Sequence, residues 1–213
     1  MDLNTSKYLG GIGAILIVIG LLGFAVTYAG ILTLIGLILM LIGLKGLADF
    51  YKEGGIFNNA LYSIILAIIG VVVAVATLVV TALNALSKIG IDLGNVSDWA
   101  GFGNELTNRF TNFADFSVIW DLIGAVVAAV VILFVFAIVA GFFFRRSLNQ
   151  LSSKTGVGLF GTAGLLMLIG AVLTIILVGF IIIWIAFILL AVGFFSIKTT
   201  IQPPPAASPT PQS

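Results

Sequence analysis

The sequence predicts an all-α, polytopic membrane protein with six transmembrane helices and one amphipathic helix outside the bilayer. Three observations lead to this prediction. First, 61% of the 213 residues are hydrophobic and 8% are charged, whereas soluble proteins average about 25% charged residues. Second, residues 9–48 and 158–197 are apolar runs of about 40 residues each, too long for one membrane crossing. Third, the basic residues fall into alternate connecting segments.

The first apolar run predicts a hairpin of two helices. As a single helix it would be about 60 Å long, twice the roughly 30 Å of hydrocarbon in a bilayer. We predict spans at residues 12–27 and 31–47, with a tight turn at 28–30 that includes a glycine. Lys7 and the apolar stretch after it loosely resemble a signal peptide, but the apolar run resumes at Ile31 without a polar mature start. We therefore interpret this stretch as the first span.

Two longer spans are predicted in the middle of the chain, at residues 60–86 and 118–144. A polar cluster at 48–55 marks the point where the chain leaves the membrane before the first of them. A polar stretch that contains Arg145 and Arg146 follows the second, and we predict that it is a short basic loop ending at Thr155.

The second long apolar run predicts another hairpin. Its spans are expected at residues 158–178 and 180–197, with a break near Gly179 as the only local signal for a turn. Residues 203–213 hold all five prolines and no charge, which is typical of an extended or disordered tail. The helical transmembrane domain is therefore expected to cover residues 1–202.

Charge asymmetry indicates the orientation of these spans. With six spans and a cytoplasmic N-terminus, the inner segments hold seven basic residues and the outer segments hold two. The inner set is Lys7, Lys45, Lys52, Arg145, Arg146, Lys154 and Lys198, and the outer set is Lys88 and Arg109. This is the bias that the positive-inside rule describes. We expect a cell-membrane protein with both termini in the cytoplasm.

The long outer segment contains an amphipathic pattern over residues 97–115. Its apolar residues are spaced by three or four positions: Trp99, Phe102, Leu106, Phe110 and Phe113. We predict a helix that lies at the outer interface as a structural lid, with a gate or partner-binding surface as the alternative. Asn95 also begins an N-glycosylation sequon in this segment.

Small residues follow one face of several spans, where they allow helix backbones to approach closely in lipid. In the third span they are Ser63, Ala67, Gly70, Ala74 and Thr81. The second span offers Gly36 and Gly43, and the fourth offers the pairs Gly124/Ala128 and Ala125/Ala129. Packing within the chain is the ordinary interpretation, and a homo-oligomer interface or another membrane-protein partner is the alternative.

The centres of all six spans lack ionisable residues, which are the usual mark of ion paths and proton relays. Neutral polar side chains and one interfacial acid could line a narrow path for a neutral solute: Thr77, Thr81, Asn84 and Asp121. The ordinary interpretation is that Ser and Thr are common in transmembrane helices, and that Asp121 is favoured near a helix N-terminus.

Composition also excludes several chemistries. The chain has no cysteine and no histidine, so it cannot form thiolate or imidazole catalytic groups or Cys/His metal sites. Its net charge of +1 does not indicate a nucleic-acid partner. Asp49, Tyr51, Lys52 and Glu53 cluster at the inner interface, which we interpret as a solvated loop rather than a catalytic or metal site. We therefore expect no enzyme activity, no metal and no cofactor.

A weak internal repeat relates the two hairpins. An offset of 150 residues aligns Gly11 with Gly161, Leu16 with Leu166, Ile19-Gly20 with Ile169-Gly170, and Gly43 with Gly193. Both hairpins would enter the membrane from the same side, so the repeat would be parallel rather than inverted. The excess of identical residues is too small to separate duplication from shared apolar composition.

Three segments resemble an archaeal family of integral membrane proteins known as domain of unknown function 996. They are Ser6-Lys7-Tyr8-Leu9-Gly10-Gly11-Ile12-Gly13, the stretch from Leu44-Lys45 through Asp49 and Tyr51 to Ile56-Phe57-Asn58-Asn59-Ala60-Leu61, and Gly179-Phe180 through Trp184 to Phe194-Phe195-Ser196-Ile197. The resemblance implies an archaeal source and a place in the cell membrane, and it implies no activity.

Together these features predict a non-catalytic integral membrane protein that acts through helix packing or partner binding, with the lipid bilayer as its surroundings. A transporter or channel for a neutral or apolar solute is the alternative. A solidly packed bundle would favour the first hypothesis, and a continuous polar path would favour the second.

Overall fold

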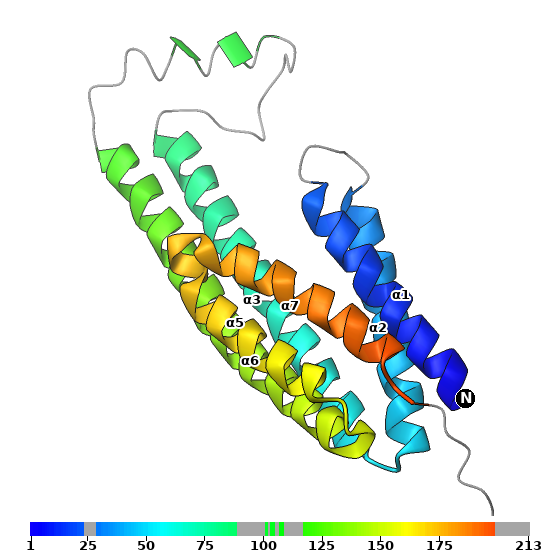
Figure 1. Cartoon of the computed structure of the whole chain (residues 1–213). Coiled ribbons are helices and arrows are strands. Elements are labelled where there is room, and N and C mark those ends of the chain that lie inside the picture. The colour runs from blue at the N-terminus through cyan, green and yellow to red at the C-terminus, as the bar shows by residue number, and fades with distance from the viewer. Residues whose placement is uncertain (24–28, 89–100, 102, 105–106, 109–116, 199–213) are drawn as a thin grey trace, which may run out of the picture. The chain divides into compact units, whose positions relative to one another are not determined.

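A computed structural model of the chain describes residues 1–23, 29–88, 101, 103–104, 107–108 and 117–198. No strand occurs among these residues. The helices are α1 (Leu3–Leu22), α2 (Ala29–Phe50), α3 (Gly54–Lys88), α5 (Ser117–Thr155), α6 (Gly158–Leu173) and α7 (Val178–Phe195), with a 3-10 turn, η2 (Thr174–Ile176), after α6 (Figure 1). Within the described chain, six helical segments are long and apolar enough to cross a membrane, which confirms the predicted fold class.

The first helix begins and ends earlier than the predicted span at 12–27. The Asp2 side chain accepts a hydrogen bond from the Thr5 backbone N–H at 3.3 Å, so it caps the helix N-terminus well before the uninterrupted apolar run. The helix ends at Leu22. The predicted turn at 28–30 is wrong in part, because Ala29 and Gly30 already belong to α2.

The expected basic loop after the fourth span is helical. α5 continues through Arg145 and Arg146 to Thr155, so the charges mark where the apolar segment ends and not where the helix ends. Arg, Leu, Gln and Lys, which make up much of this stretch, have favourable helix propensities. Gly156, with φ of 72°, then ends the helix, and its N–H donates to the Ser152 carbonyl at 2.9 Å.

The break between the last two helices also differs from the prediction. α6 ends at Leu173, and the chain turns through η2 and Leu177 rather than at Gly179. Gly179 lies inside α7, where an added Cβ would meet the backbone of Gly170 and Thr174. The glycine therefore allows the two helices to approach closely, and the turn itself is made by residues that carry no turn signal in the sequence.

The chain divides into two compact units. Unit 1 contains residues 1–57, 147–163 and 184–213, and unit 2 contains residues 58–146 and 164–183. The long helices α3 and α5, and the hairpin α6–α7, each contribute residues to both.

In unit 1, α1 packs along α2 (Figure 1). Glycines on both helices lie in the contact. A Cβ at Gly13 would lie 2.5 Å from the Met40 backbone nitrogen, and one at Gly36 would lie 2.6 Å from the Gly13 carbonyl oxygen. The small residues predicted on the second span therefore serve packing within the chain. Phe194 of α7 covers Gly10 of α1, which ties the last helix to the first hairpin.

In unit 2, α3 packs on α5 along the predicted small face. A Cβ at Gly70 would lie 2.5 Å from the Phe136 Cβ. On α5 the structure buries the pair Ala125/Ala129, whereas Gly124 has open space around it and Ala128 is exposed. Of the two candidate pairs in the fourth span, Ala125/Ala129 is therefore the packing pair.

The close contacts and burial of the two hairpins agree with the internal repeat. Gly20 approaches Thr33 and Ala29, and the residues 150 positions later, Gly170, Ile183 and Gly179, make the same close approach. Eleven buried positions recur at this offset: Gly10, Gly13, Ala14, Ile17, Gly20, Ala29, Gly36, Met40, Gly43, Leu44 and Leu47, with Phe160, Ala163, Gly164, Met167, Gly170, Gly179, Ala186, Leu190, Gly193, Phe194 and Ile197. The two hairpins thus share one packing register, including positions where their residues differ.

Candidate functional site

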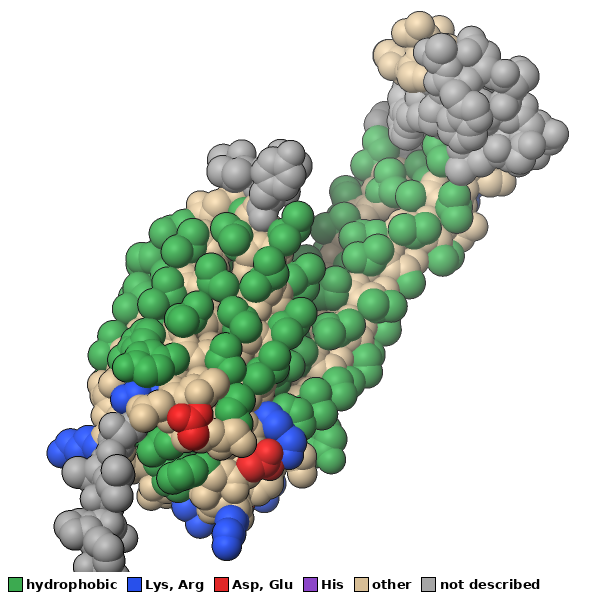
Figure 2. Space-filling view, turned by 90° about the vertical axis from the view of Figure 1, so that its right-hand side faces the viewer, with side chains coloured by type: hydrophobic (Ala, Val, Ile, Leu, Met, Phe, Trp, Pro, Cys, Tyr) green, Lys and Arg blue, Asp and Glu red, His purple; other side chains and the backbone are tan. Residues whose placement is uncertain are grey.

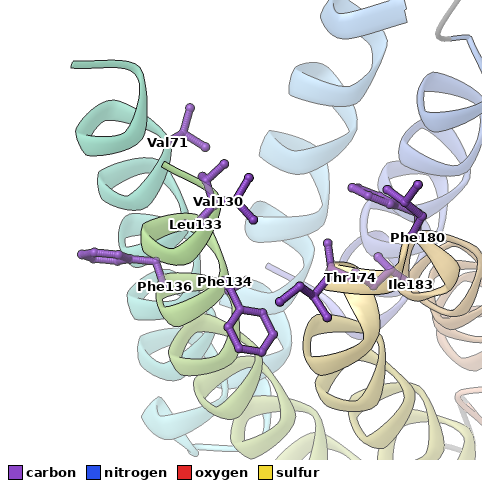
Figure 3. A pocket seen from close by; sticks show the side chains of 12 residues that line it. Val71, Val130, Leu133, Phe134, Phe136, Thr174, Phe180 and Ile183 are labelled. Carbon is purple, nitrogen blue, oxygen red and sulfur yellow. The ribbon is translucent and has the colours of Figure 1, made fainter. Parts of the chain in front are cut away.

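Unit 2 contains an apolar cavity of about 560 Å³. Figure 3 shows side chains of α5 on one side of it and side chains of the α6–α7 turn and α7 on the other. The lining residues are Ala67 and Val71 of α3, Val130, Leu133, Phe134, Phe136 and Ala137 of α5, Thr174 and Ile175 of η2, Leu177, and Phe180 and Ile183 of α7.

The cavity forms because α6 is much shorter than α5. The sixteen residues of α6 extend about 24 Å and the thirty-nine of α5 extend about 58 Å. α6 packs on α5 at Gly141, where an added Cβ would lie 3.4 Å from the Ala171 Cβ. One turn farther along α5, at Ala137, the end of α6 leaves that face of α5 open.

The cavity offers no free hydrogen-bonding group among its lining side chains. Thr174 supplies the one polar side chain of that lining, and its hydroxyl donates to the Gly170 carbonyl at 2.8 Å. A recess with such a lining favours apolar molecules over polar ones. A volume of this size lies within the range of about 300–1,000 Å³ found for small-molecule sites.

The turn that forms one wall carries backbone strain. Leu177 has φ of 64° and ψ of −23°, the left-handed conformation, and it is 73% exposed. This conformation costs a residue with a Cβ about 1–2 kcal/mol, and glycine usually occupies such positions after a helix. Leu177 is thus both strained and part of the cavity lining, and most of its large apolar side chain remains exposed.

A second, polar pocket lies between the C-terminal end of α3 and the N-terminal end of α5. It measures about 500 Å³ and is lined by Thr81, Asn84, Ser87, Lys88 and Asp121. Lys88 donates to the Asp121 carboxylate at 2.5 Å, and both side chains are about half exposed. An exposed ion pair of this kind contributes little to stability.

The structure thus brings together three of the four residues predicted to line a polar path: Thr81, Asn84 and Asp121. Thr77 is not part of this pocket, and its hydroxyl donates to the Val73 carbonyl at 2.9 Å. Sequence reasoning missed Lys88 and Ser87. The signal that could have found Lys88 is its place at the end of one long span, opposite an acid at the start of the next.

The polar pocket and the apolar cavity do not share lining residues. Along α3 they are separated by the ten positions from Val71 to Thr81, about 15 Å. Around α5, Asp121 and Val130 are nine positions apart, which places them about 180° from each other. The two recesses therefore open toward different faces of α5 and do not form one continuous polar path through the described lining.

At the opposite end of α3 and α5, the acidic residues of the polar cluster at 48–55 have basic partners in unit 1. Lys154 lies 3.2 Å from the Glu53 carboxylate, and Lys45 lies 2.6 Å from that of Asp49. Burial raises the pKa of Tyr51. Figure 2 shows charged side chains gathered at one end of the helices and apolar side chains along their lengths. No cluster of three acidic residues suited to a metal ion occurs in the part of the chain that the structure describes.

The predicted outer stripe and glycosylation site cannot be placed. Trp99, Phe102, Leu106, Phe110 and Phe113, together with Asn95, lie outside the described residues.

Comparison with known proteins identifies the family of this chain. The profile of a family described as "Protein of unknown function (DUF996)" matches residues 32–188, which include every residue that lines the two pockets. The chain belongs to the DUF996 family. It is also 32% identical over 202 residues to the uncharacterized protein MJ1644 of Methanocaldococcus jannaschii, across 95% of this chain and 97% of that protein. No solved structure matches.

These matches confirm the family that the sequence resembles, and the M. jannaschii relative agrees with the implied archaeal origin. The DUF996 profile covers most of α2 and α7 and all of α3, α5 and α6. The matched region therefore includes both the helix pair α3–α5 and the hairpin that closes the apolar cavity.

Proposed function

We propose that this DUF996 protein is a non-catalytic, multi-pass membrane protein that binds an apolar molecule within the bilayer. The apolar cavity of unit 2 carries the proposal. It is formed by helices that are long and apolar enough to span a membrane, and its lining is free of unpaired polar side chains. An apolar molecule dissolved in the membrane is the ligand such a site accepts.

The proposed orientation places both termini and the basic segments in the cytoplasm. Lys7, Lys45 and Lys154 belong to the described part of this basic end, and Lys88 belongs to the opposite end of α3. The positive-inside rule supports this direction over the reverse.

The chemistry of the cavity favours binding over catalysis. Its lining contains no carboxylate, amine or thiol, and the Thr174 hydroxyl is engaged by the Gly170 carbonyl. An acid–base or nucleophilic reaction needs such a group within hydrogen-bond reach of its substrate.

A small photoreactive probe tests this proposal. Trifluoromethyl-phenyldiazirine, added to the purified protein in liposomes, is expected to label the cavity wall on α5 and η2. Ala137→Trp fills the cavity and should lower that labelling about tenfold. Ala128→Trp is the matched control, because Ala128 is exposed on the same helix and does not line the cavity. Equal labelling of both variants would contradict the proposal.

A carrier or channel for a neutral or apolar solute is the second candidate function. The observation that favours it is the polar pocket of Thr81, Asn84 and Asp121 at the outer end of the α3–α5 pair. Solute flux into proteoliposomes that falls on Asp121→Ala would support transport. Flux equal to that of protein-free liposomes would leave binding as the function.

A further inference from the structure

We infer that the occupant of the apolar cavity is the hydrocarbon chain of a membrane lipid. This inference rests on the proposed function and names its ligand class. Four observations lead to it: the depth of the cavity along α5, its opening toward the side of the helices, the bulk of its walls, and the strained residue in one wall.

The depth of the cavity indicates which molecules can reach it. Its α5 residues run from Val130 to Ala137, between eight and fifteen positions from Arg145. At 1.5 Å per residue this is about 12–22 Å from the basic end of the apolar segment, inside a hydrocarbon layer of about 30 Å. Lipid chains are the abundant apolar material at that depth.

The cavity opens sideways along the helices. Large apolar side chains both line it and remain exposed: Val71 is 52% exposed, Val130 is 45% exposed and Phe180 is 51% exposed. A chain in the surrounding bilayer can therefore enter from the side without passing a polar opening. Its head group remains at the membrane surface, since the cavity has no free polar side chain to receive it.

The walls favour a flexible chain over a helix from a second copy. Helices associate in lipid through small residues that let their backbones approach. Here the wall contains Leu133, Phe134, Phe180 and Ile183. These bulky side chains keep a second backbone at a distance, whereas a hydrocarbon chain can bend to fill the space between them.

The strained turn adds an independent argument. Leu177 holds a left-handed conformation that glycine adopts without strain, and it lies in the cavity wall. Non-glycine residues in such conformations cluster at ligand-contacting sites, where the surrounding structure maintains them. We assign to the Leu177 side chain the role of holding the lipid chain against α5.

Photocrosslinking with a lipid probe tests the inference. The probe is a phospholipid with a diazirine in the middle of one chain, incorporated into proteoliposomes of the full chain. Crosslinks are expected on Phe134, Leu177 and Phe180, as read by peptide mass spectrometry. Ala137→Trp should reduce them about tenfold and Ala128→Trp should leave them unchanged. Ala67→Phe narrows the cavity from α3 and provides a second filled variant should Ala137→Trp fail to fold.

The outcomes separate this inference from the proposed function. Labelling by the small diazirine without labelling by the lipid would overturn the lipid assignment and leave apolar binding in place. Absence of cavity labelling by both the small diazirine and the lipid probe would overturn both the lipid assignment and the proposed apolar binding. An intermolecular disulfide in the single-cysteine variant Leu177→Cys, without lipid crosslinks, would identify a second copy as the occupant. Competition by free hexadecane but not by unlabelled phospholipid would identify a free hydrocarbon instead. Leu177→Gly should weaken the lipid crosslinks, and unchanged crosslinks would remove the role assigned to Leu177.

Discussion

Gly156 and Leu177 hold the left-handed backbone conformation at the ends of helical segments, as Lys52 does after α2, and the first two have opposite consequences. Gly156 ends α5 with φ of 72° and has open space around its Cα, whereas Leu177 ends η2 with φ of 64°. A Cβ is disfavoured in this region by about 1–2 kcal/mol. The sequence places glycine at one of these ends and a bulky residue at the other, and the bulky residue is the one beside the cavity.

We therefore predict that Gly156→Ala lowers the free energy of unfolding by about 1 kcal/mol and that Leu177→Gly raises it by a similar amount. Unfolding in mixed detergent micelles, followed by circular dichroism, measures both. Gly158→Ala is the control, because Gly158 has open space and no positive φ. A stability loss in Leu177→Gly would show that contacts of the leucine side chain outweigh its backbone strain.

A second residue-scale prediction concerns the cap of α1. Hydrogen bonding to Thr5 lowers the pKa of Asp2. Because the folded pKa lies below the unfolded value, the stabilising effect is complete above the ordinary aspartate pKa and is lost as the pH falls through the folded pKa. The protection factors of the amides in the first turn of α1, corrected for the intrinsic pH dependence of exchange, should therefore fall only at acidic pH. Asp2→Ala should show low protection at every pH, and Asp2→Asn should retain much of the protection.

At the scale of the elements, glycine contacts decide which helix faces pack together. Gly70 of α3 lies against Phe136 of α5, and Gly124 of α5 has nothing within 4 Å of a built Cβ. The sequence presents both as small residues on an apolar helix. Only the position of the neighbouring helix separates a packing glycine from an exposed one.

This contrast predicts opposite effects of the same substitution. Gly70→Ala should lower the free energy of unfolding by about 1–3 kcal/mol, because the new methyl group overpacks the contact with Phe136. Gly124→Ala should be neutral or raise it by up to about 1 kcal/mol through helix propensity. Thermal unfolding of the two variants in one detergent compares them directly. Equal losses would mean that Gly124 has a partner in the folded protein.

At the scale of the whole molecule, the six helices and the basic segments predict one topology. The chain has no cysteine, so single-cysteine variants give an unambiguous accessibility test. Ser153→Cys and Lys198→Cys should react with a membrane-impermeant maleimide only when the cytoplasmic face is exposed. Lys88→Cys should react in intact cells. Reaction of Ser153→Cys and Lys198→Cys from different faces would contradict an even number of crossings between them.

The sequence correctly predicted most of the architecture because length and apolar composition act locally. An apolar run of about 40 residues must fold back once in a bilayer, whatever its neighbours are. The helix ends were predicted less well. Charges at Arg145 and Arg146 end the apolar segment, yet the helix continues to Thr155, because hydrogen bonding along a helix does not require apolar side chains.

The candidate site was predictable only in part. Thr81, Asn84 and Asp121 are rare polar residues in apolar segments, so the sequence indicates them directly, and the structure gathers them in one pocket. The apolar cavity has no such signal. Phe134 and Phe180 are ordinary residues of apolar helices, and they line a cavity only because α6 ends beside Ala137.

By itself, the sequence determined how many long apolar helices the described chain contains and predicted a lipid solvent and the pairing of helices into hairpins, because these follow from how many consecutive apolar residues must be hidden from water. The internal repeat depends on both levels: the sequence suggests it weakly through identical residues, and the structure adds matching buried positions in the two hairpins. The tertiary structure alone decided which small residues pack, where the strained turn lies and that an apolar cavity exists. These depend on the distance between helices far apart in the chain, and no local pattern of residues encodes that distance.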